Sequence, residues 1–255
     1  MKRIRLVLQY DGTAYAGWQI QENAVTIQEL VEKAIASVTK TETKVICAGR
    51  TDSGVHAFEQ TAVFDTASQV TADNFKQALN ANLPPDIRVT NSEDCPGDFH
   101  PRYRAKQKTY SYIISTDRAN SVFLRRYSWE MNHKLNLDAM REAAQYLIGK
   151  HDFTSFRASG CGASHAVREL HNITISGPAP VEFITFSLNT PVIKISIEGS
   201  AFLRHMVRII VGTLVKIGRE KYPPEKIKEI LDSKDRRNAG QTAPACGLFL
   251  EKINY

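Results

Sequence analysis

The segment 49-GRTDSGVHA-57 places a carboxylate and a guanidinium within one short turn. Arg50 and Asp52 are separated by a single threonine. Gly49 and Gly54 have the spacing of a phosphate-binding P-loop, but a Val-His pair replaces the Lys-Ser/Thr pair that holds phosphates and magnesium. The turn therefore favours a carboxylate held beside a guanidinium over a nucleoside triphosphate site. Taken alone, an aspartate in a glycine-rich turn is more often a turn residue than a catalyst.

The segment 101-PRYRAKQKTYSY-112 carries a cation at every second position. In an extended strand these side chains would point to one face, and two tyrosines continue the same parity. Cations for phosphates and a flat ring for a base are what single-stranded or flipped nucleotides require. The alternative interpretation is a solvated strand face that ends in tyrosines. The residues of this basic row are Arg102, Arg104, Lys106 and Lys108, followed by Tyr110 and Tyr112.

The apolar stretch 202-FLRHMVRIIVGTLVKIG-218 predicts a helix with Arg204 and Arg208 at the edge of its apolar stripe. An arginine that borders a core needs a partner or a polar cleft, because an unpaired buried charge is costly. Asp52 is one candidate partner and phosphate is another. Extension of either side chain into solvent is the alternative.

Composition limits the classes of protein to which the chain can belong. Of its 255 residues, 42% are apolar and 24% charged, and the formal net charge is +6, which is compatible with a nucleic-acid partner. No apolar run reaches the length of a membrane span, and residues 1–12 lack the features of a signal peptide. The four cysteines form no CxxC pair, which favours free thiols in a cytoplasmic protein and argues against structural zinc.

The periodicity of apolar residues predicts two strand–helix–strand halves in succession. Such halves indicate an α+β fold with two lobes, 1–105 and 106–255, and mainly antiparallel sheets. The predicted helices cover 26–38, which opens with a Thr-x-x-Glu capping box, 72–81, 137–148, 202–218 and a segment after Pro223-Pro224. The predicted strands cover 1–10, 44–48, 58–65, a segment that begins within 83–89, and 108–115, 167–175, 181–188, 192–199 and 247–253.

Seven ordered segments resemble the tRNA pseudouridine synthase A family, and together they extend over nearly the whole chain. The stretch 158-ASGCGASHAVREL-170 departs from the pattern, so the resemblance assigns no RNA contact there. The matching segments are 8-LQYDGTAYAGWQIQ-21, 49-GRTDSGVHA-57, 79-LNANLPPDI-87, 98-DFHPRYRAKQKTYSY-112, 150-KHDFTSFR-157, 202-FLRHMVRIIVG-212 and 244-PACGLFL-250.

The resemblance implies two pseudo-symmetric lobes around a central basic cleft, in a homodimer that needs no cofactor or metal. It implies isomerisation of uridine to pseudouridine at positions 38–40 of the tRNA anticodon stem-loop. Asp52 would be the catalytic aspartate, Arg208 its partner, and Tyr110 the ring against the target base. Arg50 would help to displace the target nucleotide, and the basic row and Leu248 would bind substrate.

Two other functions remain open at this level. A non-catalytic RNA-binding protein would need the cations and aromatic rings but not Asp52 with Arg208. An acid–base hydrolase would need a second carboxylate near Asp52, and the chain has no G-x-S-x-G motif. Asp11 could supply that carboxylate, although its place in 10-YDGTAYAGW-18 is more typical of a residue that shapes a turn.

Overall fold

The computed structural model describes residues 1–116, 122–183 and 186–255, and the chain divides into two compact units. The first unit comprises Met1–Lys106 and Phe249–Tyr255, and the second comprises Gln107–Leu248. All of the last strand, β10 (Leu248–Asn254), except its first residue belongs to the first unit. The lobe boundaries expected from the sequence assigned this strand to the second half of the chain.

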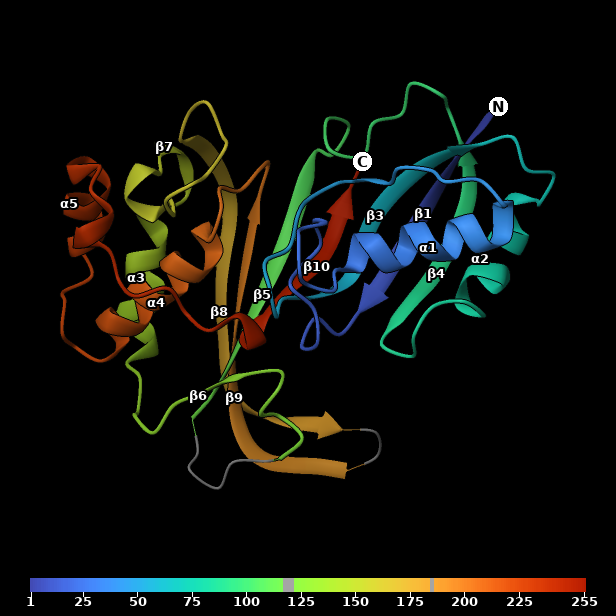
Figure 1. The fold of residues 1–255 in the computed structure, drawn as a ribbon. Helices are drawn as coiled ribbons and strands as arrows, with labels where there is room; N and C mark the ends of the chain where they lie inside the picture. The colour runs from blue at the N-terminus through green and yellow to red at the C-terminus, as the bar shows by residue number, and fades with distance from the viewer. Residues whose placement is uncertain (117–121, 184–185) are drawn as a thin grey trace. The chain divides into compact units, whose positions relative to one another are not determined.

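The first unit is built on a sheet with the strand order β4-β1-β3-β10. β1 pairs antiparallel with both β3 and β4, whereas β10 pairs parallel with β3 and places Phe249 opposite His56. Figure 1 shows helix α1 running across this sheet, and α2 packs against α1 and β4. The bounds are β1 (Lys2–Tyr10), α1 (Ile27–Thr39), β2 (Ile46–Cys47), β3 (His56–Thr66), α2 (Ala72–Asn80) and β4 (Ile87–Cys95).

The sequence explains why α1 begins where it does. The hydroxyl of Thr26, in extended backbone conformation, accepts a hydrogen bond from the N–H of Glu29, which is the N-terminal cap predicted from the capping-box pattern. The apolar residues Ile27, Val31 and Ile35 recur at helical spacing and are fully buried. The helix therefore buries its apolar face and exposes its polar face.

The second unit contains an antiparallel sheet with the order β5-β9-β8-β7, and the short β6 pairs parallel with β5. In Figure 1 the helices α3, α4 and α5 lie together to one side of β8 and β9. The predicted α+β class with mainly antiparallel pairing is thus confirmed. The bounds are β5 (Gln107–Ser115), β6 (Trp129–Glu130), α3 (Leu137–Gln145), β7 (Gly149–Asp152), β8 (Val167–Phe183), β9 (Phe186–Gly199), α4 (Met206–Gly218) and α5 (Lys226–Ser233).

Two predicted elements of this unit differ in the structure. The sequence predicts three strands over 167–199, whereas the structure has two long ones, β8 and β9. The predicted strand 181–188 contains the end of β8 and the start of β9, which pair with each other. Residues 184–185 lie outside the described residues. The helix expected from residue 202 begins only at Met206. His205 has φ 60° and ψ 4°, and this left-handed conformation prevents the α-helix from extending toward residue 202. Arg204 therefore precedes the helix, and the prediction that it shares a helix edge with Arg208 is wrong.

Helix α4 makes an unusually close backbone contact with the segment 239–243. A Cβ added to Gly212 would lie 1.8 Å from the carbonyl oxygen of Gln241, and one added to Gly240 would lie 2.5 Å from the backbone of Gly212. The N–H of Gly240 also donates to the hydroxyl of Thr213 at 2.8 Å. The absence of side chains at both glycines allows the segment to lie directly on the helix.

We expect Gly212→Ala to destabilise the protein, although Gly→Ala inside a helix ordinarily stabilises by up to about 1 kcal/mol. Overpacking against the carbonyl of Gln241 should reverse the sign and cost about 1–3 kcal/mol. The measurement is the midpoint of urea unfolding. Gly162→Ala is the control, because no described atom lies within 4 Å of its added Cβ. A Gly212→Ala midpoint at or above that of the wild type would contradict the packing argument.

Candidate active site

Asp52 lies in the first unit, on the turn between β2 and β3. Its side chain is half-buried, and its carbonyl accepts the N–H of Val55 at 3.1 Å, which closes the turn. Gly54 has φ +76°, a conformation that glycine adopts without strain. The turn therefore presents a carboxylate from a backbone whose conformation is fixed. Arg50, on the same loop, is exposed.

The segment 10–18 holds this turn from one side. The hydroxyl of Tyr10 hydrogen bonds with the hydroxyl of Thr51 at 2.8 Å, and the carbonyl of Thr51 accepts the N–H of Trp18 at 3.0 Å. The carbonyl of Tyr15 accepts the hydroxyl of Ser53 at 3.2 Å. Burial raises the pKa of the Tyr10 phenol further above its ordinary value, so its hydroxyl stays protonated even in alkaline solution.

Two glycines bring the backbones of these segments into direct contact. A Cβ on Gly17, which has φ +92°, would lie 2.6 Å from the carbonyl oxygen of Thr51 and 2.9 Å from the carbonyl carbon of Asp52. A Cβ on Gly12 would lie 2.0 Å from the carbonyl oxygen of Val55. The position of Asp52 thus depends on the absence of side chains in another segment.

A third segment, 79–87, joins the other two. The hydroxyl of Tyr15 donates to a carboxylate oxygen of Asp86 at 2.5 Å, and the N–H of Asp11 donates to the carbonyl of Asp86 at 3.0 Å. The carboxylate of Asp11 accepts both the N–H and the hydroxyl of Thr13, which confirms its interpretation as a residue that shapes a turn. It also lies 3.1 Å from Nδ1 of His56. Three segments of the family resemblance therefore meet around Asp52.

Tyr110 and Arg208 belong to the second unit. Tyr110 lies on β5 opposite Ile197, is 8% exposed, and meets the ring of Phe202 edge-on with 5.0 Å between centroids. Arg208 lies in the first turn of α4, where its Nε donates to the carbonyl of Ala243 at 2.7 Å and its own carbonyl accepts the N–H of Ala243 at 3.1 Å. Each candidate is thus fixed by a neighbour from a distant part of the sequence.

Tyr112 anchors the segment 243–248 to β5. Its ring is fully buried, and its hydroxyl donates to the carbonyl of Pro244 at 2.8 Å, while burial raises its pKa. A Cβ on Gly247 would lie 2.8 Å from the Tyr112 ring, so the segment passes close to it. Leu248 is 5% exposed. Tyr112 therefore has a packing role, and its buried ring is not available for a nucleotide base to stack on.

The basic row is not a continuous strand, so the parity prediction is wrong for its first part. Strand β5 begins at Gln107, and residues 101–104 form a turn in which the N–H of Arg104 donates to the carbonyl of His100 at 3.0 Å. Arg104 also pairs with the carboxylate of Asp98 at 2.7 Å. Arg102, Arg104 and Lys106 are exposed and lie in the first unit, whereas Lys108 is buried and lies in the second.

Residues 1–116, 122–183 and 186–255 contain no cluster of three or more His, Cys, Asp or Glu side chains that could hold a metal ion. The four cysteines are free thiols. None of the helices in these ranges is both long and apolar enough to cross a membrane.

A family model described as tRNA pseudouridine synthase matches residues 6–104 and 143–255. The chain belongs to this family. The chain is 45% identical to "tRNA pseudouridine synthase A" of Thermoanaerobacter sp. (strain X514), 45% identical to the protein of that name from Clostridium acetobutylicum and 43% identical to that from Geobacter sulfurreducens. Each comparison extends over 100% of both chains. Among solved structures, an archaeal box H/ACA sRNP Nop10-Cbf5 complex matches 83% of this chain and 44% of that chain at 10% identity, with a TM-score of 0.38.

The sequence pattern missed the residues that support the family's aspartate loop. Tyr10 was expected only as the last apolar residue of a strand, and Tyr15 only as part of a loop. Their contacts with Thr51 and Ser53 join residues about 40 positions apart, and no periodicity reports such a contact. Two glycines in 10–18, next to aromatic residues, were the available signal, because glycine permits close approach of another backbone.

We expect Gly17→Ala to displace the Asp52 turn. An alanine at φ +92° is strained by about 1–2 kcal/mol, and its methyl group would meet the backbone of Thr51 and Asp52. The expected result is a lower urea midpoint, with changed amide NMR shifts at Thr51–Gly54. Gly97→Ala is the control in the same unit, because its added Cβ has no described neighbour within 4 Å. Unchanged shifts at Thr51–Gly54 in Gly17→Ala would show that the turn does not depend on this contact.

Proposed function

We propose that the protein isomerises uridine to pseudouridine in tRNA, at positions 38–40 of the anticodon stem-loop. One observation above all supports this: relatives named tRNA pseudouridine synthase A match the chain from end to end. The loop around Asp52 adds support, because a catalytic carboxylate must be held in a fixed position.

The proposed reaction needs no redox change and no phosphate chemistry. The N1–C1′ bond breaks, the uracil turns while it stays bound, and C5 joins C1′. The C5 proton is then lost and N1 gains a proton, so the product is an isomer of the substrate. Asp52 can act as a nucleophile at C1′ or C6, or as a base at the sugar.

In this proposal Arg208 keeps the carboxylate of Asp52 ionised, because a guanidinium nearby favours the charged form. Tyr110 lies against the target base, and the edge-on ring of Phe202 holds it in place. Arg50 helps to displace the target nucleotide, for which its exposure is suitable. The exposed Arg102, Arg104 and Lys106, with Lys108 and Leu248, contribute to substrate binding.

The assembly and location of the enzyme are part of the same proposal. The family resemblance supports a cytoplasmic homodimer that works without a cofactor or metal. A non-catalytic RNA-binding protein is disfavoured, because the named relatives are synthases over their full length.

Asp52→Asn should abolish isomerisation while tRNA binding persists. The substitution keeps the size of the side chain and removes its charge, and most affinity for nucleic acid comes from phosphate contacts elsewhere. The measurement is tritium release from unmodified tRNA labelled with [5-³H]uridine, because isomerisation must remove the C5 hydrogen. Filter binding of the same tRNA is the parallel readout. Tritium release at the wild-type rate would remove Asp52 from the mechanism, and no release by the wild-type protein would refute the proposed function.

Tyr110→Phe and Tyr110→Leu should separate the role of the hydroxyl from that of the ring. A uridine must leave its stack to be modified, and stacking on an aromatic ring returns roughly 1–3 kcal/mol per base. Phe should keep tRNA affinity but slow single-turnover isomerisation, since the hydroxyl is proposed to act late, as a proton acceptor or hydrogen-bonding group. Leu should weaken both. Wild-type single-turnover rates for both variants would leave Tyr110 with a packing role only.

A further inference from the structure

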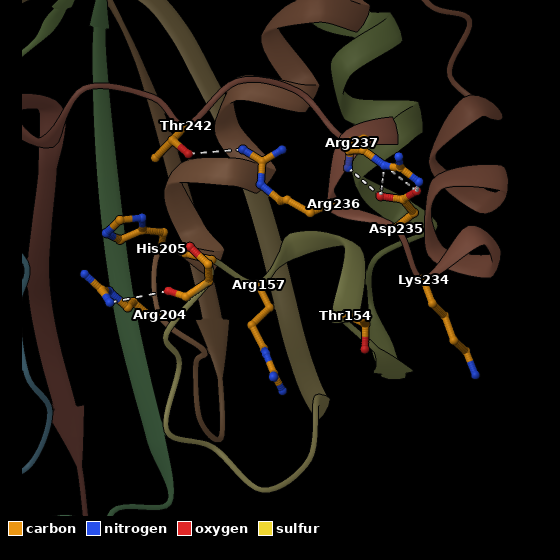
Figure 2. Close-up of a pocket in the computed structure, with 11 residues that line it drawn as sticks. Thr154, Arg157, Arg204, His205, Lys234, Asp235, Arg236, Arg237 and Thr242 are labelled. Atoms are coloured by element: carbon orange, nitrogen blue, oxygen red, sulfur yellow. Dashed lines mark hydrogen bonds and ion pairs between the residues drawn. The ribbon is translucent and has the colours of Figure 1, made fainter.

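A cavity of about 1030 Å³ opens in the second unit, built from three separate segments of the chain (Figure 2). The segments are 154–159, 204–205 and 234–242, and none of them belongs to the proposed catalytic set. The lining residues with polar side chains are Thr154, Arg157, Ser159, Arg204, His205, Lys234, Asp235, Arg236, Arg237 and Thr242.

The lining is strongly cationic. Five of its side chains are arginine or lysine, and Asp235 supplies its one carboxylate. That carboxylate is already occupied, because both of its oxygens accept hydrogen bonds from the guanidinium of Arg237 at 2.6–3.1 Å. Lys234 lies 3.5 Å from the carboxylate of Asp152. Within the described ranges, no carboxylate lies within ion-pair distance of Arg157, Arg204 or Arg236, so no described residue neutralises their charges.

Arg236 is held in place by neutral groups alone. Its guanidinium donates to the carbonyl of Gly240 at 2.9 Å. It also donates to the hydroxyl of Thr242 at 3.1 Å (Figure 2). The side chain is half-buried, and burial lowers its pKa. A guanidinium nevertheless remains protonated in proteins. Partial burial of a charge without an anion is unfavourable, and a bound anion would stabilise the guanidinium.

Hydrogen bonds also join the segments 154–159 and 204–205. The N–H of Ala158 donates to the carbonyl of Arg204 at 3.1 Å, and the guanidinium of Arg204 donates to the carbonyl of Ser159 at 3.4 Å. Thr154 is anchored by two hydrogen bonds to the carboxylate of Asp152. Figure 2 shows the side chains of Arg157 and Lys234 extending in a similar direction from the ribbon, one on each side of Thr154. The cations are therefore displayed from an ordered backbone.

The chemistry of the lining selects among classes of ligand. Among the described residues that line the cavity, none is Phe, Tyr or Trp, so no ring of that kind is available for a base to stack on. Pockets for small organic molecules are predominantly apolar, unlike this one. Several unneutralised guanidinium groups match phosphodiester oxygens, to which arginine binds with two parallel hydrogen bonds.

We propose that this cavity is a binding site for backbone phosphates of the tRNA substrate, separate from the residues that act on the target uridine. The inference rests on the proposed function for the identity of its RNA ligand. The segment that holds Arg236 through Gly240 and Thr242 also holds Arg208 through Ala243. The cavity and Arg208, the proposed partner of Asp52, are thus linked through the backbone of residues 240–243.

The test is the double variant Arg157→Gln/Arg204→Gln in the full chain, with binding of unmodified tRNA measured from 0.05 to 1 M salt. Loss of two phosphate contacts should reduce the slope of log K against log salt by about 1.4–1.8, which corresponds to about 10–30-fold weaker binding at 0.15 M salt. Arg219→Gln is the control, since Arg219 is an exposed arginine of the same unit outside the cavity lining. It should bind like the wild type.

The outcomes separate this inference from the proposed function. A reduced slope, with a higher tRNA concentration for half-maximal tritium release and an unchanged urea midpoint, supports the site. Wild-type affinity and slope in the double variant would overturn it, even if the wild-type protein isomerises uridine. Weaker binding of inorganic phosphate with unchanged tRNA binding would also overturn it, because the site would then take free anions or an acidic partner. If the wild type releases no tritium but the double variant still has a reduced salt slope, the proposed function is refuted and the phosphate site is supported.

Discussion

The close contact between the Gly17 backbone and the Thr51 carbonyl is the constraint on which the first unit depends. Trp18, Tyr10 and Tyr15 can bind the Asp52 turn only because the two backbones touch, and a single methyl group at Gly17 would force them apart. The same contact places the turn against the segment 10–18, in which the hydroxyl of Tyr15 donates to the carboxylate of Asp86. Contacts of the main chain and of neighbouring hydroxyl groups therefore fix the backbone of the turn that carries Asp52.

The second unit uses the same device at another place. Gly212 and Gly240 let the segment 239–243 lie against α4. Ala243 receives the guanidinium of Arg208, while Gly240 receives that of Arg236. Arginines with distinct proposed roles are thus positioned by carbonyl groups of one short segment. A change in that segment would alter both.

Much of the fold could be predicted from the sequence, because apolar periodicity is a local property. The strand at 1–10 and the helix at 26–38 follow directly from it, and the structure has β1 and α1 close to those bounds. The errors arose where the backbone conformation departs from what a sequence pattern predicts. At His205 the left-handed conformation delays the start of a helix that the apolar pattern predicts from residue 202. At 101–104 a turn replaces the strand that the alternating cations predict. The candidate aspartate was visible through its motif. Its supports were not, since Tyr10 and Tyr15 act across about 40 residues of chain.

The pairing of β10 with β3 has a consequence for the order in which the molecule forms. Phe249 stacks on His56 and Phe58 with ring centroids 4.7 and 5.4 Å apart, next to the turn that carries Asp52. A ribosome synthesises all of the second unit between these partners, so the sheet of the first unit stays one strand short while more than half of the chain emerges. Contacts of such high sequence separation form slowly, and the start of β3 at His56 and Ala57 lacks its β10 partner until then. The sheet of the unit that carries the aspartate turn is therefore complete only after translation has reached β10.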